Sequence, residues 1–280
     1  MIAVLLALAS AASYGVSDFL GGLFAKRDSA WTIALWGQTG ALLSAGAMAL
    51  VFGGAPAGPD FLWAAVSGVG SGLGGAFLYR GLANGRMSVI APISAVVSAA
   101  VPVVVGVATG ERPSAMTWFG IAVGLVAIWL VARAPDPAGA PREGTGASIV
   151  DGVLAGAGFG ASFAAIGQIR DEAGLWPNAA SMVVAVVVLL GAVLLMRAPI
   201  LLPPRRALLA LTPGVLSAAA LAFFLFASQQ GLLTVVAVIG SLYPASTLIL
   251  AALVLRERVH PGQAVGLGAC AVAVGLVAAG

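Results

Sequence analysis

The chain has 280 residues, of which 61% are hydrophobic and 8% are charged. Soluble domains carry about 25% charged residues, so this composition excludes a water-soluble fold and indicates an integral membrane protein. The net charge is only +3 and the basic residues are scattered between apolar runs, which argues against a nucleic-acid partner.

Ten apolar runs follow one another along the chain. A helix needs roughly 20 apolar residues to cross a bilayer, and these runs are too long and too continuously apolar for barrel strands. The first run has no basic region before it, so it predicts a retained span rather than a cleaved signal peptide. The predicted helical spans are 2–25, 31–53, 61–82, 87–109, 115–133, 149–170, 177–197, 206–230, 234–255 and 262–280.

Near the middle of the chain, residues 135–147 form a linker rich in proline and glycine. The linker separates a first domain, residues 1–134, from a second domain, residues 148–280, and each domain holds five predicted spans. The fold class that we expect is therefore an all-α integral membrane protein with ten transmembrane helices.

The two domains match each other as an internal repeat. A shift of 146 positions lays Glu111-Arg112 on Glu257-Arg258, and such a match is rare among so few charges. Because each repeat crosses the membrane an odd number of times, the second enters from the opposite side, and the two form inverted five-helix repeats. Inverted repeats place substrate sites near the membrane midplane.

The loops indicate the orientation of the chain in the membrane. Of the 13 lysines and arginines, only Arg112 and Arg170 lie in the even-numbered loops, which leaves eleven for the odd-numbered loops and their helix ends. The positive-inside rule then places the odd-numbered loops in the cytoplasm and both termini outside.

The first span carries Asp18, the only carboxylate well inside an apolar run. An ionised carboxylate in the bilayer costs roughly 3 kcal/mol, and such residues usually face a cavity on an ion or substrate path. We expect Asp18 to exchange a proton for a cationic or zwitterionic substrate. The alternative is an interfacial residue that pairs with an arginine such as Arg80.

Tyr14 and Ser17 lie within one helical turn of Asp18, and this combination of ring, hydroxyl and carboxylate suits a small amine. With a shift of 145, residues 14–17 match residues 159–162, both with the pattern aromatic-Gly-x-Ser, and Asp18 falls on a phenylalanine. The matching residues Phe159, Ser162 and Phe163 are predicted to face the first span as an aromatic wall, unless they only pack helices. Further candidates for the substrate or coupling site are Tyr79, Ser94, Gln168 and Tyr243.

The fourth and ninth spans contain helix-breaking residues at comparable depth, namely Pro92 and Pro102 in one and Gly240 and Pro244 in the other. Proline frees a carbonyl one turn earlier and bends the helix. These four residues are candidate hinges or cavity-lining positions. Simple packing kinks are the alternative, because proline is common in transmembrane helices.

With these features the chain resembles the EamA branch of the drug/metabolite transporter superfamily. The resemblance rests on the two five-span repeats, the aromatic-Gly-x-Ser element of each first span, and a glutamate at the end of each fourth span, in residues 109–113 and 255–259. It implies a central cavity between the repeats and export of small metabolites, amino acids or drugs. The family commonly has cytoplasmic termini, opposite to the charge count, and the second glutamate lacks the preceding glycine.

The sequence therefore favours a secondary active transporter that exports small metabolites or amine-like compounds by alternating access, with proton coupling through Asp18. An uncoupled facilitator stays open as an alternative. An intramembrane lipid-modifying enzyme is disfavoured, because the sole histidine, His260, lies in a loop and Cys270 has no partner. We expect no catalytic residue, cofactor or metal. The expected partners are a small molecule, the lipid bilayer and H⁺, in a bacterial inner or plasma membrane, and a homodimer is left open.

Overall fold

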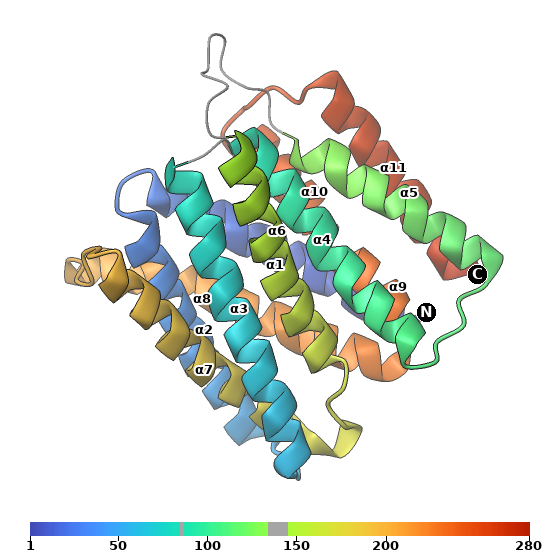
Figure 1. The fold of residues 1–280 in the computed structure, drawn as a ribbon, viewed down its shortest axis with the longest axis horizontal. Coiled ribbons are helices and arrows are strands. Elements are labelled where there is room, and N and C mark those ends of the chain that lie inside the picture. Colours follow the sequence, from blue (N-terminus) through green and yellow to red (C-terminus); the bar gives the residue numbers. More distant parts are fainter. Residues whose placement is uncertain (85–86, 134–144) are drawn as a thin grey trace.

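The computed structural model describes residues 1–84, 87–133 and 145–280, and within them the side chains of all residues but 79, 81–84, 87–89 and 145. The described part is helical (Figure 1). Its helices are α1 (Ile2–Ala25), α2 (Ala30–Phe52), α3 (Gly58–Asn84), α4 (Met87–Ala108), α5 (Ala115–Ala132), α6 (Thr145–Ile166), the 3₁₀ turn η1 (Asp171–Ala173), α7 (Trp176–Leu195), α8 (Pro204–Gln230), α9 (Leu233–Gly240), α10 (Tyr243–Val254) and α11 (Pro261–Ala279).

Ten segments of the described chain are long and apolar enough to cross a membrane, with α9 and α10 together forming one of them. This confirms the predicted ten-span architecture. The boundaries differ most at α6, which ends at Ile166 and not at residue 170. The amides of Gln168 and Ile169 then donate to the carbonyls three residues back, and this tighter turn leads the chain into the connection with α7.

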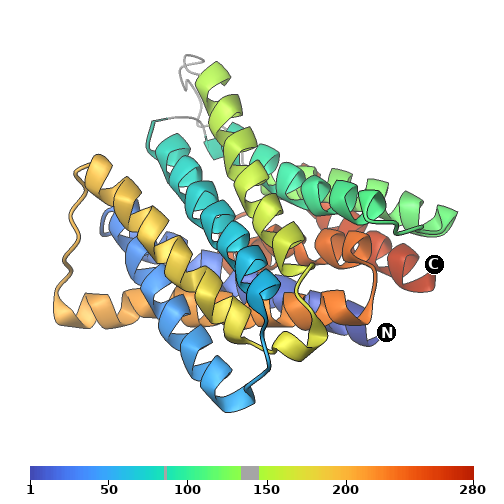
Figure 2. The ribbon, with the colours of Figure 1, turned by 60° about the horizontal axis from the view of Figure 1, so that its bottom comes forward.

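The two repeats pack against each other with approximate two-fold symmetry. Helix α1 packs against α8, α9 and α10, which are the third and fourth spans of the second repeat. Helix α6, the first of its repeat, packs in the same way against α3 and α4. Helix α2 packs against α8 as α7 packs against α3 (Figures 1 and 2). The first helix of each repeat is therefore inserted into the other repeat.

The fifth spans of the two repeats, α5 and α11, lie side by side (Figure 2). A side chain built at Gly120 would lie 2.6 Å from Val277, and one built at Gly266 would lie 2.8 Å from Val131. Small residues let transmembrane helices approach closely. These glycine faces are therefore used between the two repeats within one chain.

The two ends of the helix bundle differ in their connections. We call the end with the α1–α2, α3–α4, α5–α6, α7–α8 and α10–α11 connections the arginine-rich face, and the opposite end the arginine-poor face. The largest buried cluster includes Ile166, Ile169, Leu175, Leu233 and Val236, which border the α6–α7 and α8–α9 connections. The hydrophobic core is thus concentrated toward the arginine-poor face.

The fourth spans of the two repeats differ in continuity. Helix α4 runs without interruption past both Pro92 and Pro102. The ninth span is broken, because α9 ends at Gly240 and α10 restarts with Pro244 in its first turn. Pro244 cannot donate to the Gly240 carbonyl, and a glycine at the same place weakens the helix further. A break was expected in both spans, but the repeat shift of 146 lays Gly240 and Pro244 on Ser94 and Ser98 of α4, so the combination of glycine and proline occurs in the second repeat alone.

Candidate functional site

Aromatic rings from both repeats meet near the middle of the bundle. The ring of Tyr14 on α1 lies 5.8 Å from Phe163 on α6, in an edge-to-face arrangement, and 6.2 Å from Tyr243 on α10. Phe163 stacks on Phe224 of α8 at 4.7 Å. We call these four residues the central aromatic cluster. It places the matching elements of the two first helices, Tyr14 and Phe163, in direct contact.

Asp18 lies one turn along α1 from Tyr14, and its side chain is exposed. The flanking contacts fix its direction: a side chain built at Gly15 would collide with Ser246 of α10, and the Ser17 hydroxyl donates to the Pro213 carbonyl of α8 at 2.8 Å. Successive helical residues rotate by about 100°, so Asp18 points between these two contacts. Its exposure is therefore to the interior between α8 and α10, and not to lipid.

Asp18 has room around it on the side of the arginine-rich face. A side chain built at Gly21 or Gly22, one turn further along α1, would have no atom of another element within 4 Å. Asp18 interacts electrostatically with Tyr14 and Tyr243, and no ion pair with it is found among the described residues. Between Asp18 and the arginine-rich face, α1 is therefore uncontacted at Gly21 and Gly22.

The serines of the two aromatic-Gly-x-Ser elements lie at helix interfaces. Ser17 bonds to α8, and the Ser162 hydroxyl lies 2.8 Å from that of Ser67 on α3. Both serines are buried, and each joins the first helix of one repeat to the third span of the other. This geometry supports the packing alternative for the two hydroxyls.

The remaining candidates lie at different places. Phe159 packs over Gly74 of α3, and Ser94 is buried, with its hydroxyl donating to the Ala91 carbonyl at 3.2 Å. Gln168 follows the end of α6 at the arginine-poor face. The side chain of Tyr79 falls outside the described residues. The central aromatic cluster and Asp18 therefore bring together part of the predicted set.

Arg80, the arginine suggested as a partner of Asp18, is engaged elsewhere. Its guanidinium forms an ion pair with Asp151 of α6 and lies 4.7 Å above the ring of Phe77. The pair joins α3 to α6 near the arginine-rich face. This contact argues against the interfacial interpretation of Asp18.

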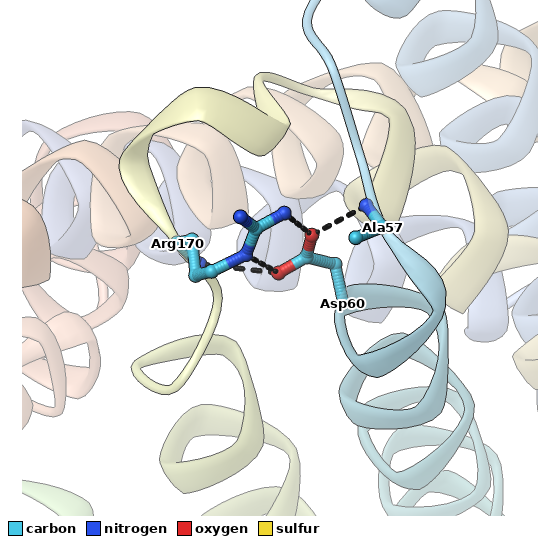
Figure 3. A network of polar contacts seen from close by, with 3 residues as sticks. All are labelled: Ala57, Asp60 and Arg170. Carbon is cyan, nitrogen blue, oxygen red and sulfur yellow. Dashed lines mark hydrogen bonds and ion pairs between the residues drawn. The ribbon is translucent and has the colours of Figure 1, made fainter.

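At the other end of the same two helices, Asp60 and Arg170 form a bidentate ion pair that the sequence did not reveal (Figure 3). Arg170 donates at 2.7 Å and 3.3 Å, and the Ala57 amide also donates to the carboxylate, at 2.7 Å. Asp60 is only 1% exposed, and its hydrogen bond raises the pKa of the Arg170 guanidinium. The pair ties the start of α3 to the end of α6.

An ion pair joins the α1–α2 connection to α8 at the arginine-rich face. The 146-residue shift lays Asp60 on Arg206, and Arg206 donates to Asp28 at 3.1 Å. An arginine of the second repeat thus stands at the position of an aspartate of the first, and the Arg206 side chain is 56% exposed. This reversed match was the signal in the sequence that could have identified the Asp60 pair.

Main-chain bonds close the arginine-poor face around the Asp60 pair. The Ala55 amide donates to the Glu172 carbonyl at 2.7 Å, and the Leu175 amide donates to the Gly53 carbonyl at 3.4 Å. Gly174 has a φ of +61°, and a side chain built there would lie 2.2 Å from the Gly53 carbonyl. The α2–α3 and α6–α7 connections are therefore joined directly, backbone to backbone.

The two signature glutamates have different surroundings. The Glu111 carboxylate accepts the backbone amides of Leu233 and Thr234, the latter at 2.9 Å, and so caps the start of α9. Glu257 is 57% exposed and lies 3.8 Å from Lys26. Glu111 therefore has a structural role at a helix end, where it joins the α4–α5 connection to α9.

Comparison with known proteins agrees with this architecture. A solved structure titled only "Crystal structure of protein" matches with a TM-score of 0.76 and 11% identity, covering 98% of this chain and 95% of that chain, which shows a shared fold. No curated protein matches the chain. The model of the EamA-like transporter family matches residues 1–133 and again residues 147–279. These two matches reproduce the repeats on either side of the linker, and the chain therefore belongs to the EamA-like transporter family, within the drug/metabolite transporter superfamily.

Proposed function

We propose that the protein is a secondary active transporter that exports a small metabolite by alternating access, with proton coupling through Asp18. The observation that carries the proposal is the position of this carboxylate: it is exposed toward the interior, beside Tyr14 and Tyr243, and α1 is uncontacted at Gly21 and Gly22 on the side of the arginine-rich face. A charged group is retained at such a depth in a membrane protein when it lies on an ion or substrate path.

The chemistry of the site favours a cationic or zwitterionic amine. Aromatic faces attract cations, and a carboxylate supplies the opposite charge in a setting where few other charges compete. Tyr14 and Tyr243 also offer hydroxyl groups for hydrogen bonds. The site can hold either a proton on Asp18 or the positive charge of the substrate, which is the requirement for exchanging one against the other.

The side on which α1 is uncontacted supports a state that is accessible from the arginine-rich face. By the positive-inside rule the arginine-rich face is cytoplasmic, so the structure represents a state that loads from the cytoplasm. The two interlocked repeats supply the means of switching, because inverted repeats can exchange conformations around a fixed central site. For this charge arrangement we propose a bacterial inner membrane as the location.

The proposal is tested in two steps. Metabolite profiles of cells with and without the protein identify compounds that accumulate outside, and one of these is then loaded into proteoliposomes. Asp18→Asn is expected to abolish the dependence of flux on a pH gradient, whereas Asp171→Asn, in the η1 turn, serves as the matched control and is expected to keep it. Unchanged gradient-driven flux in Asp18→Asn contradicts proton coupling and favours the uncoupled facilitator.

A further inference from the structure

The cap that Glu111 places on α9 links the fourth spans of the two repeats. The first amides of a helix have no partner within the helix, and the positive end of the helix dipole favours a carboxylate there. Both oxygens of Glu111 are used, one for Leu233 and one for Thr234. A side chain built at Gly106 would lie 2.6 Å from Glu111 Oε2, so the absence of a side chain at Gly106 leaves room for the carboxylate.

The repeat offers the same cap at the opposite face. The 146-residue shift that relates Glu111 to Glu257 also relates Leu233 and Thr234 to Met87 and Ser88, the first residues of α4. Glu257 does not use this cap in the structure, since its side chain is largely exposed and lies near Lys26. One face of the bundle therefore has its glutamate engaged, and the other has its glutamate at the surface.

The state of each glutamate matches the state of its face. The face with the engaged Glu111 is the one closed by the Ala55–Glu172 and Leu175–Gly53 backbone bonds. The face with the exposed Glu257 is the one toward which the space beside Asp18 opens.

On the basis of the alternating access proposed above, we propose that the two glutamates are alternating latches. Glu111 holds the arginine-poor face closed by capping α9. In the opposite state Glu111 releases α9, and Glu257 holds the arginine-rich face closed by capping α4 at the amides of Met87 and Ser88.

The residue before each glutamate biases this exchange. Gly110 precedes Glu111 with a φ of +108°, a conformation open to glycine, whereas Arg256 precedes Glu257 with a φ of +56°. An arginine that must follow the glycine path to place Glu257 on α4 is strained there. The second latch is therefore the weaker one, which favours the state seen in the structure.

The latches are tested by cysteine accessibility in nanodiscs, where a polar maleimide reaches both faces. In a Cys270→Ala background, Ala237→Cys reports on the closed side, because Ala237 is fully buried between the central aromatic cluster and the arginine-poor face. Gly22→Cys reports on the open side. The measured quantity is the ratio of the two labelling rates.

Removing one latch is expected to shift the ratio roughly tenfold, since hydrogen bonds to a charged group are worth about 1.5–3 kcal/mol. Glu111→Gln raises labelling at position 237 and lowers it at position 22. Arg256→Gly, which relieves strain without removing a contact, shifts the ratio in the same direction. Glu257→Gln shifts it in the opposite direction by a smaller factor, and the ratio of the Glu111→Gln/Glu257→Gln double variant lies between those of the two single variants.

Glu172→Gln makes the same chemical change on the arginine-poor face and is expected to leave the ratio unchanged. The proposal is overturned if Glu111→Gln increases labelling at both reporters, which indicates general loosening, or if Arg256→Gly and Glu257→Gln leave the ratio unchanged. The labelling needs no substrate. If the variants leave the labelling ratio unchanged while the protein still transports, the latch proposal is refuted and the transport proposal stands. If the ratio shifts as expected but no flux is found, the transport proposal is refuted and the latch proposal stands.

Discussion

Helices α1 and α6 occupy equivalent positions but differ in their chemistry. Each is inserted into the opposite repeat and bonded there through a buried serine, Ser17 in one case and Ser162 in the other. One residue further along, α1 carries the exposed Asp18, and α6 carries Phe163, which is 7% exposed and stacked on Phe224. The comparison teaches that the duplicated scaffold is symmetric, whereas the residue in a position to carry charge is present once.

The largest effect is expected when the residue of one helix is replaced by its counterpart, Asp18 by phenylalanine or Phe163 by aspartate. Phe163→Asp removes a stacked ring and buries a carboxylate, and is expected to lower the free energy of unfolding by at least about 3 kcal/mol. The measurement is unfolding of the purified protein in mixed micelles.

Asp18→Phe is the matched control for Phe163→Asp. It is expected to keep the parental stability while losing coupling, because its position opens into free space beside Gly21 and Gly22. Equal stability losses in both exchanges would show that the two positions are equally packed, against the structure.

The ends of the two helices sharpen the comparison. Asp60→Asn weakens a bidentate pair whose carboxylate is buried, at the end of α6, and is expected to cost about 2 kcal/mol of folding free energy. Asp28→Asn weakens the exposed pair at the end of α1 and is expected to stay within about 0.5 kcal/mol of the parent. Thermal unfolding in detergent distinguishes the two variants. A larger loss of stability for Asp28→Asn than for Asp60→Asn would contradict this difference between the two helix ends.

The serines give the smallest effect, and here the two helices are expected to behave alike. Ser17→Ala and Ser162→Ala each lose one buried hydrogen bond between helices. Each loss is expected to lower the free energy of unfolding by about 1 kcal/mol. Ser228→Ala, which loses only a bond to Leu225 within its own helix, is the control. A change in flux without a change in stability for either serine would assign it to the substrate path instead.

Much of the fold could be predicted because it depends on patterns within short segments. Apolar runs define the spans, and the match of Glu111 with Glu257 defines the repeat. The same match predicted that the first helices face each other, as Tyr14 and Phe163 do.

Contacts between distant segments could not be predicted in this way. Neither Asp60 nor Arg170 stands out in its own segment, and the amides capped by Glu111 belong to backbone that carries no side-chain signature. The broken ninth span was expected, but the continuity of α4 depends on how well its neighbours hold a proline-containing helix. Tertiary packing decides such cases.

The ion pairs at the two faces have a consequence for assembly. In both pairs the acid belongs to the first repeat, as Asp60 or Asp28, and the arginine belongs to the second, as Arg170 or Arg206. Opposite charges therefore meet across the boundary between the repeats at both ends of the bundle. These two contacts favour pairing between the two halves of the chain.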